Sequence, residues 1–372
     1  MVDSVADERP AGRVNFESGG NGSLSNSELW WRDRYHDIVA SGYKPRPRYD
    51  PGWQPSWTRK TSRKDSFVTD DFQPTPFRSV MDATRMHDGK RVMLKKVLPE
   101  EGSHELSIIR FFSSDELRTN PSNHCVTLLE LIDTAGTKLD KKLMVMPFLR
   151  PFNHPRFQTF GEFVAFFIQI CEGLQFMHQN NVAHRDCTVN NIMFDPSDMY
   201  PKGYHISRIN RSRDLKGRAE RHTRTDRPPR YYLINFGLSR KYSSREVVDE
   251  PLRGGDETTP EHSLGGRCNP FRTDIYNLGN VVREQFLMKC NGFEFMQGLV
   301  DEMTDESPER RPTIEGVIKG FDHIRSSLST IKLRSLISLK KDPRLFTASR
   351  HVRQLIRTAR YIVLKKAAIP IP

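Results

Sequence analysis

The feature that most constrains this chain is the run His184–Asn191, which reads H-R-D-C-T-V-N-N and precedes a segment expected to be a strand. It fixes an aspartate, Asp186, and an asparagine, Asn191, five residues apart. Forty-four positions after Asn191 comes a second motif, Asn235-Phe236-Gly237. The order and spacing of these two motifs limit the fold more than any other part of the sequence.

Length and composition allow one large core or two lobes with terminal extensions, because the chain has 372 residues of which 36% are apolar. The five cysteines are scattered and form no C-x-x-C pair, which favours a reducing compartment and argues against a zinc site. Residues 1–26 contain no apolar signal-peptide region, and no run of 18 apolar residues occurs. We therefore expect an intracellular protein, cytoplasmic or nuclear, without a transmembrane segment.

The net charge of +12 is concentrated in two segments. Residues 201–230 carry ten Lys and Arg against three acidic residues, a net charge of +7, and residues 331–366 carry eleven against one, a net charge of +10. Such segments attract anionic partners, whether nucleic acid, lipid head groups or acidic proteins. The alternative interpretation is a solvated, partly disordered surface.

The region before residue 77 divides into two parts. Residues 1–26 are rich in Gly, Ser, Asn and Asp and are expected to be disordered. Residues 27–39 predict a helix with Ser27 as its N-cap, whereas the prolines of residues 42–57 exclude a regular helix or a central strand. All four tryptophans lie between positions 30 and 57, so we expect this extension to wrap a lobe and bury the rings. Docking of a partner protein is the alternative.

Strands precede helices in the remainder of the chain. The patterns predict strands at 79–84, 91–98, 126–132 and 142–148, with a turn at 87–90, and helices at 103–112, 160–179, 274–290, 293–303 and 314–324. This order predicts an α+β fold with a small β-rich N-terminal lobe and a larger α-helical C-terminal lobe.

These motifs resemble those of the eukaryotic protein kinase family over roughly residues 77–327. The resemblance implies that Lys95, in the V-A-I-K-like strand, pairs with the α- and β-phosphates of ATP and that Glu105 holds this lysine. It makes Asp186 the catalytic base, preceded by Arg185, and Asn191 a ligand of Mg²⁺. The Lys95–Glu105 ion pair is a prediction, and a surface pair of little energetic value is the alternative.

The resemblance also implies a nucleotide site and two structural anchors. The positions expected to contact ATP are Lys95, Val80, Met93, Met146, Phe148, Met193 and Asn191, and those expected to bind the metal are Asn191 and Asn235. Thr259-Pro260-Glu261 resembles the A-P-E end of an activation segment, with Arg311 as the salt-bridge partner of the glutamate. The segment 274–279 resembles the D-x-W-x-x-G helix start that anchors the catalytic loop.

Several positions depart from the family pattern. The three glycines of the phosphate-binding loop would fall at Gln73, Thr75 and Arg78, where backbone cannot approach phosphates as it does at glycine. Met93 replaces a small residue facing adenine, and Thr188 stands where a phosphate-steering lysine is expected. Asn235 replaces the metal-binding aspartate, which should lower occupancy by Mg²⁺.

An insertion and two extensions complete the predicted domain organisation. The basic segment 196–231 makes the spacing between the two motifs about 30 residues longer than in the family, which a surface loop tolerates at small entropic cost. We expect a disordered N-terminus (1–26), a Trp/Pro-rich extension (27–76), a kinase-like domain (77–327) and a basic tail (328–372). This layout resembles a group of kinase-like proteins of mushroom-forming fungi.

Two functions follow from this pattern. The retained Lys95, Glu105, Asp186 and Asn191 favour an active ATP-dependent Ser/Thr kinase. The missing glycines and Asn235 favour a pseudokinase, a scaffold or regulator with weakened or lost binding of ATP and Mg²⁺. We expect phosphotransfer to be impaired or absent, and the sequence does not identify a protein substrate or partner.

The tail predicts a basic amphipathic helix. Its apolar residues recur at helical spacing, at Val352, Leu355, Ile356, Ala359, Ile362 and Val363. Arginines flank this apolar face at Arg350, Arg353, Arg357 and Arg360. Such a helix binds nucleic acid or a membrane surface, or docks on its own lobe.

Overall fold

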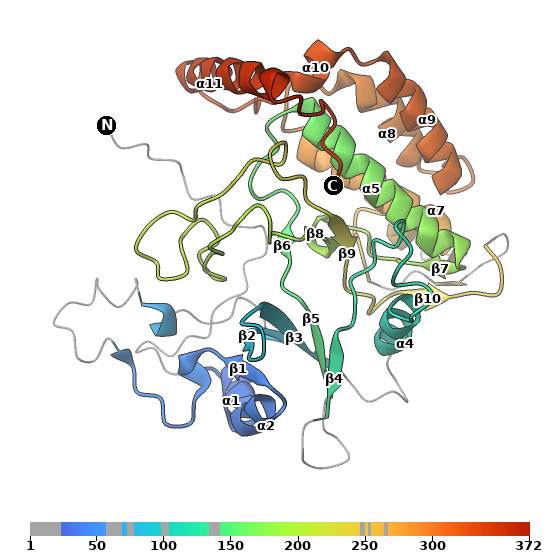
Figure 1. The fold of residues 1–372 in the computed structure, drawn as a ribbon. Coiled ribbons are helices and arrows are strands. Elements are labelled where there is room, and N and C mark those ends of the chain that lie inside the picture. Colours follow the sequence, from blue (N-terminus) through green and yellow to red (C-terminus); the bar gives the residue numbers. More distant parts are fainter. Residues whose placement is uncertain are drawn as a thin grey trace. The chain divides into compact units, whose positions relative to one another are not determined.

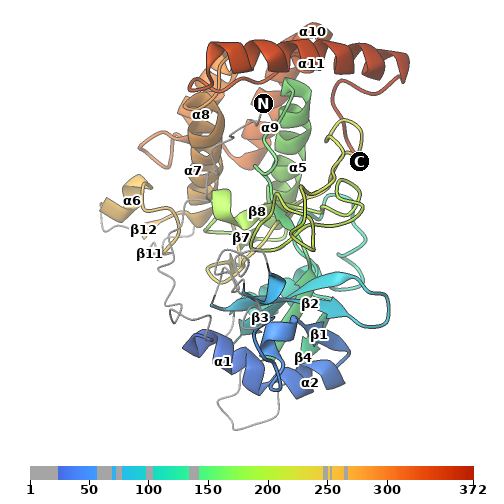
Figure 2. The same cartoon turned by 90° about the vertical axis from the view of Figure 1, so that its left-hand side faces the viewer.

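The computed structural model describes residues 24–56, 69–72, 78–97, 104–133, 142–245, 250–251, 254–263 and 267–372 (Figures 1 and 2). The chain divides into two units. The first consists of residues 1–96 with 204–219, and the second of residues 97–203 with 220–372. Part of the basic insertion therefore belongs to the same unit as the N-terminal extension.

Three antiparallel strands form the sheet of the first unit, in the order β1 (Tyr43–Pro45), β2 (Val80–Arg85), β3 (Arg91–Val97). Strands β2 and β3 confirm the two strands predicted at 79–84 and 91–98. Their register places Val80 opposite Lys95. Strand β1 comes from the extension and is an edge strand. An edge strand tolerates Pro45, which has no backbone N–H to donate to a second neighbouring strand.

The extension begins with two helices, α1 (Asn26–Asp33) and α2 (Tyr35–Ala40), followed after β1 by a single 3-10 turn, η1 (Pro47–Tyr49), and later by η3 (Asp70–Phe72). The prediction of one helix over 27–39 capped by Ser27 was wrong. The N-cap is Ser25, whose backbone N–H donates to the Glu28 carboxylate three residues later, 3.0 Å away. The helical geometry breaks at Arg34, which has φ −107° and ψ 11°.

Trp30 and Trp31 of the extension pack on the sheet of the same unit, as predicted, whereas Trp53 contacts Arg48 and Asp71 within the extension. Trp31 is fully buried, and the Lys96 ammonium of β3 lies 4.1 Å from the Trp30 ring and 4.4 Å from the Trp31 ring. The buried Arg46 guanidinium pairs with Asp82 of β2 at 3.1 Å. Trp57 lies outside the described residues.

The second unit contains most of the helices. They are α4 (His104–Phe112), α5 (Phe160–Gln179), α6 (Pro260–Ser263), α7 (Pro270–Val282), α8 (Gln297–Met303), α9 (Ile314–Ser327), α10 (Thr330–Arg334) and α11 (Arg344–Val363), with a π turn η6 (Arg283–Leu287) and 3-10 turns η5 (Val189–Asn191) and η7 (Glu294–Met296). Strands precede helices over much of the chain, so the described residues form an α+β protein.

Short antiparallel strands of the second unit surround the predicted catalytic motifs. Strand β4 (Glu130–Ile132) pairs with β5 (Lys142–Pro147); β8 (Ile192–Phe194) lies between β6 (Arg150–Pro151) and β9 (Tyr231–Leu233); β7 (Val182–Ala183) pairs with β10 (Arg240–Lys241); β11 (Glu250–Pro251) pairs with β12 (Arg267–Cys268). The motif His184–Asn191 therefore connects β7 to β8, and Asn235 follows β9.

Helix α5 occupies the core of the second unit and has the predicted bounds. Thr159 caps it by accepting a hydrogen bond from the Glu162 N–H, 3.2 Å away. Its apolar residues lie on all sides, which is typical of a buried helix. Within the part of the chain that the structure describes, α5 alone is long and apolar enough to cross a bilayer, and 83% of its apolar window is buried inside the protein.

Two boundaries in the second unit differ from the prediction. The strand expected at 126–132 is limited to Glu130–Ile132, because the Val126 N–H donates instead to the Leu233 carbonyl of β9. The helix expected at 274–290 begins at Pro270, because the Asn269 side chain caps it by accepting from the Phe271 N–H. Its α-helical part ends at Val282, where the π turn begins.

The basic insertion 196–231 is described along its whole length, and part of it is buried, unlike the solvated surface of the alternative interpretation. Arg224 is 2% exposed, donates to the Phe152 carbonyl at 2.6 Å, and lies 4.2 Å from the Phe157 ring. In the first unit, Arg91 of β3 donates to the Tyr204 carbonyl at 2.8 Å. Most of the other arginines of the insertion are exposed.

We predict that Trp31→Ala lowers the free energy of unfolding by about 3–5 kcal/mol, because it empties a fully buried indole site between the extension and the sheet. Urea denaturation measures this change. Met86→Ala, at a side chain that is 55% exposed in the same unit, is the control and should change little. Equal effects of the two substitutions would contradict the packing role of the extension.

Candidate nucleotide and phosphotransfer site

The catalytic loop is held by the buried carboxylate of Asp274 on α7. Asp274 Oδ2 accepts from the His184 N–H at 2.8 Å, and Oδ1 accepts from the Arg185 N–H at 2.6 Å. The His178 ring of α5 completes the arrangement, with Nε2 at 2.9 Å from Asp274 Oδ2. Asp274 thus anchors the loop, as the resemblance implied.

The backbone of this loop is bent at Arg185, which adopts a left-handed conformation with φ 67°. His184 supports the bend. Its Nδ1 accepts from the Asp186 N–H at 3.2 Å, so its Nε2 carries the proton and donates to the Ile234 carbonyl at 3.1 Å. Burial lowers the pKa of His184, consistent with the neutral ring that these two bonds require.

The Asp186 side chain is half-buried and receives two donors. Its Oδ2 accepts from Asn191 Nδ2 at 2.6 Å and its Oδ1 from the Thr188 hydroxyl at 3.3 Å. Burial raises the pKa of Asp186, while the hydrogen bonds from Asn191 and Thr188 oppose this shift. Thr188 therefore serves the carboxylate itself, where the family has a lysine for the phosphate.

The orientation of the Asn191 amide follows from its partners. Its Nδ2 donates to both the backbone carbonyl and the carboxylate of Asp186, and neither oxygen can donate in return. The Asn191 Oδ1 must therefore point the other way, where it accepts from Asn235 Nδ2 at 3.1 Å. The two predicted metal-binding residues are hydrogen-bonded to each other through an amide proton that aspartate does not have.

The Asn235-Phe236-Gly237 turn packs against the loop and against α4 through its central residue, Phe236. Asn235 adopts φ 67°, a region that asparagine and aspartate occupy more readily than other side chains. Phe236 is fully buried, 5.6 Å from the His184 ring and 6.3 Å from the Phe112 ring. A Cβ added at Gly237 would lie 3.9 Å from Glu105 Oε2, so the predicted αC glutamate lies beside this turn.

The predicted nucleotide contacts are divided between the two units. Val80, Met93 and Lys95 lie in the first unit, where Val80 faces Lys95 across the β2–β3 ladder and Asp82 faces Met93. Met146, Phe148 and Met193 are half-buried in the second unit. The Lys95–Glu105 ion pair and the assembly of these residues into one ATP site stay predictions.

The described residues do not fit a magnesium site of the family type. The two predicted ligands are neutral amides, and the Asn191 oxygen accepts a proton donor. Magnesium favours carboxylate and phosphate oxygens. No cluster of three or more His, Cys, Asp or Glu suited to a metal occurs among the residues that the structure describes.

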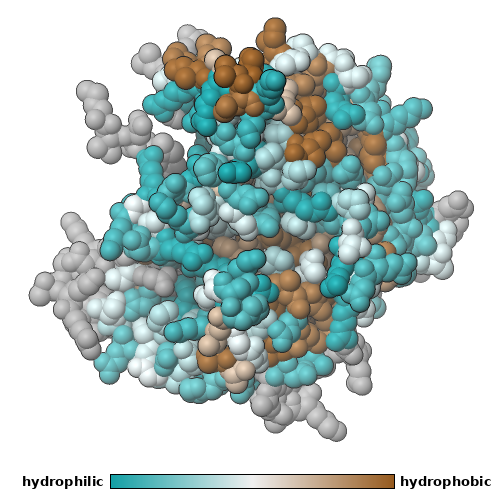
Figure 3. Space-filling view, viewed as in Figure 1, coloured by the Kyte–Doolittle hydropathy of each residue, from teal (hydrophilic) through white to brown (hydrophobic). Residues whose placement is uncertain are grey.

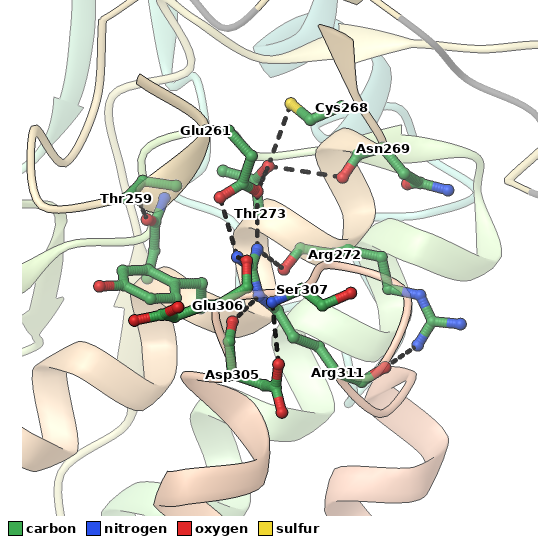
Figure 4. Close-up of polar contacts among 12 residues, drawn as sticks. Thr259, Glu261, Cys268, Asn269, Arg272, Thr273, Asp305, Glu306, Ser307 and Arg311 are labelled. Carbon is green, nitrogen blue, oxygen red and sulfur yellow. Dashed lines mark hydrogen bonds and ion pairs between the residues drawn. The ribbon is translucent and has the colours of Figure 1, made fainter. Parts of the chain in front are cut away.

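A buried ion pair anchors the end of the activation segment (Figure 4). Arg311 binds Glu261 through two parallel hydrogen bonds of 2.7 and 2.8 Å, and both side chains are nearly inaccessible to solvent. Arg311 Nε also donates to the Asp305 carbonyl at 2.8 Å. Such bidentate pairs fix geometry as well as adding energy. The pairing predicted from the A-P-E resemblance is therefore present.

Sequence reasoning missed two contributors to the site. His178 carries no motif of its own, and only the fold brings α5 against Asp274. The Asn191–Asn235 hydrogen bond joins residues 44 positions apart, and its direction depends on the Asp186 carboxylate. The sequence identified Asn191 and Asn235 as site residues, but it could not predict how their side-chain amides are oriented.

Comparisons with known proteins agree with this geometry. The family described as protein tyrosine and serine/threonine kinase matches residues 80–246, from β2 through the catalytic loop and the Asn235–Gly237 turn. The resemblance to the eukaryotic protein kinase family is confirmed over this segment, which is less than half of the chain. The predicted two-lobed α+β kinase fold is thereby confirmed.

Individual relatives are distant and match in part. The serine/threonine-protein kinase CAK1 of Saccharomyces cerevisiae is 22% identical over 151 residues, 38% of this chain and 34% of that protein. PLK4 of Drosophila persimilis is 26% identical over 199 residues (53% and 23%), and the serine/threonine kinase NLK of Caenorhabditis elegans is 24% identical over 252 residues (63% and 34%). The matches span only 23–34% of the length of these relatives.

We predict that Arg311→Met lowers the free energy of unfolding by about 3–5 kcal/mol, because it leaves the buried Glu261 carboxylate unpaired. The double variant Glu261→Leu/Arg311→Met should recover part of this loss, since it removes the isolated charge. Denaturant titration of both variants measures the difference.

The matched control is the half-exposed pair Arg245–Glu315, whose side chains are 38% and 42% exposed. Arg245→Met should cost about 0–1 kcal/mol. If Arg311→Met is as mild as Arg245→Met, the buried pair does not anchor the activation segment.

Proposed function

We propose that this protein is a kinase-fold binding module, a scaffold or regulator whose phosphotransfer is impaired or absent. One observation carries the proposal: Asn235 Nδ2 donates to Asn191 Oδ1 at 3.1 Å. In a kinase these two positions present oxygens to the metal ions that neutralise the transferring phosphate. Here the Asn235 amide instead donates a hydrogen bond to the Asn191 oxygen.

The energetic consequence for phosphotransfer supports the proposal. Neither Asn191 nor Asn235 carries a negative charge, so the pair offers a divalent cation only weak dipoles. Loss of one preorganised electrostatic contact at a reacting centre costs about 3–4 kcal/mol, or roughly 100- to 1000-fold in rate. A turnover reduced by this factor is compatible with a role in binding.

The residues at the predicted nucleotide-binding positions also support the proposal. Gln73 and Thr75, at two of the glycine positions, lie outside the described residues, and Arg78, at the third, is exposed on the approach to β2. Glycine at these positions lets backbone amides reach phosphate. Met93 adds bulk to the face that would contact adenine. We therefore propose that ATP binding is weakened or lost and that any residual binding depends little on Mg²⁺.

The alternative is an active ATP-dependent Ser/Thr kinase that uses Asp186 as its base. The anchored catalytic loop, the Asp186 carboxylate and the position of Glu105 beside the Asn235–Gly237 turn favour it. The raised pKa of Asp186 gives this alternative a signature. Turnover should fall as the pH is lowered, at pH values above those at which an ordinary aspartate becomes protonated.

Compartment and partners belong to the same proposal. The five cysteines are buried thiols, which supports an intracellular location, cytoplasmic or nuclear. No protein substrate or partner follows from the described residues. The chain's similarity to Ser/Thr kinases supports ATP as the nucleotide to test.

We predict that Asn235→Asp increases Mg²⁺-dependent ATP binding and raises autophosphorylation by roughly 100-fold or more, because it replaces the donating amide by a carboxylate. Aspartate tolerates the left-handed backbone of this position, so the variant should fold. Thermal shift with ATP, with and without Mg²⁺, and transfer of labelled phosphate measure the two effects.

The control is Asn235→Asp/Asp186→Asn, which should keep the gain in binding and lose the gain in transfer. Measurable phosphate transfer by the unmodified protein that disappears in Asp186→Asn would establish the active kinase instead. If Asn235→Asp changes neither binding nor transfer, the metal pair is not the limiting feature and the missing glycines become the explanation.

A further inference from the structure

We propose that α11 is a binding site for the surface of an anionic lipid bilayer, a function separate from the kinase-fold site. The helix is described over Arg344–Val363 and lies at the outer edge of the second unit, beside α10 (Figures 1 and 2). Its contacts, its exposed side chains and its charge each support this interaction.

Helix α11 docks on its own unit through polar side chains. Gln354 and Tyr361, two helical turns apart, are buried. Gln354 Nε2 donates to the Arg334 carbonyl of α10 at 3.3 Å, and the Tyr361 hydroxyl lies 2.7 Å from the Thr223 hydroxyl and 3.2 Å from the Asp226 carboxylate. The prediction that the tail docks on its own lobe is therefore correct for this face.

The residues that follow α11 fasten its C-terminal end. Arg334 donates to the Lys366 carbonyl at 2.6 Å, and a Cβ at Gly161 of α5 would collide with the Ala368 carbonyl. The helix is thus held in one orientation. This orientation determines which side chains face outward.

The apolar face of α11 points away from the docked face. Five large aliphatic side chains are exposed on it: Val352 at 59%, Leu355 at 70%, Ile356 at 67%, Ile362 at 59% and Val363 at 80%. At 3.6 residues per turn these positions share one side of the helix, opposite Gln354 and Tyr361. Figure 3 shows hydrophobic surface over this part of the molecule. Exposed apolar surface of this extent marks an interaction site.

The charge of this segment selects an anionic partner. Residues 343–372 contain seven Lys and Arg and no Asp or Glu. Arg353 and Arg360 are exposed beside the apolar face, and Arg360 also lies 3.9 Å from the Asp226 carboxylate. Arg350 and Arg357 bond to Asp342 and Gln158 of the same unit. A helix that presents aliphatic side chains flanked by arginine is suited to the boundary between acyl chains and anionic head groups.

The shape of the exposed face favours a bilayer over a protein groove. The apolar residues follow one helix for about 16 Å from Val352 to Val363, at 1.5 Å per residue, and so form a convex ridge. Among residues 348–363, the part of this helix whose side chains the structure describes, no exposed large hydrophobic residue is aromatic, although protein interfaces are enriched in aromatics. A planar lipid surface accepts such a ridge without a complementary groove.

The experiment is co-sedimentation of the full chain with phosphatidylcholine vesicles, with or without phosphatidylserine. We expect binding to the vesicles that contain phosphatidylserine, decreasing as salt is added. Leu355→Asp/Ile356→Asp should reduce the affinity by roughly tenfold or more, because each change removes an exposed aliphatic side chain from the lipid and adds a negative charge. Its melting temperature should match that of the unmodified protein, since both positions are exposed.

Two controls separate the contributions. Leu129→Asp, at an exposed side chain (41%) that precedes β4, introduces one aspartate at an apolar position outside α11 and α10 and should leave binding unaltered. Arg353→Gln/Arg360→Gln should weaken binding and reduce its salt dependence while keeping the apolar face.

Three outcomes would overturn the proposal. The first is equal binding of the unmodified protein and Leu355→Asp/Ile356→Asp. The second is self-association that disappears in this variant while vesicles are not bound, which would assign the face to a second copy of the chain. The third is tight binding of a single-stranded oligonucleotide that survives this variant, with no vesicle binding.

Discussion

The buried carboxylate of Asp274 is the interaction on which the site depends. It joins α7, α5 and the catalytic loop by accepting hydrogen bonds from two consecutive backbone amides and by pairing with the His178 ring. Without these bonds the left-handed Arg185 would lack its support, and the neighbouring Asp186 and Asn191 would lose their relative orientation. The buried carboxylate of Asp274 thus determines the relative orientation of Asp186 and Asn191.

The contacts that hold the kinase fold together are retained, whereas several residues predicted to take part in phosphotransfer are changed. The loop anchor, the Glu261–Arg311 pair and the buried Phe236 are all in place, and each is a packing or hydrogen-bonding feature. The differences from the family at the predicted site include a neutral Asn235, a threonine at 188, a methionine at 93 and other residues at the three glycine positions before β2. A fold retained with altered electrostatics is the pattern that the proposed binding role predicts.

The parts of the structure that the sequence predicted well depend on local patterns. Helix α5 was predictable at both ends because Thr159 caps a continuous apolar run, and Asp274, Glu261 and Arg311 were predictable from motif order. A local hydrogen bond of Ser25 explains the wrong N-cap at Ser27, and a hydrogen bond to the distant Leu233 explains the wrong strand start at Val126. The outward apolar face of α11 was one of the alternatives that the sequence left open, because amphipathic spacing alone does not tell whether that face docks on the protein or binds a surface. Tyr361 and Gln354 bond to Thr223 and Arg334, which are distant in sequence, and these contacts orient the helix with its apolar face outward.

The left-handed backbone at Asn235 has a genetic consequence. Asparagine and aspartate are the two non-glycine side chains that fit this conformation most readily and have nearly the same shape. Their codons differ at a single base. The predicted metal-binding position, Asn235, is therefore one point mutation from the family's residue, and its backbone conformation accepts both side chains. A lineage carrying this gene can lose or regain that ligand without first passing through an unfolded protein.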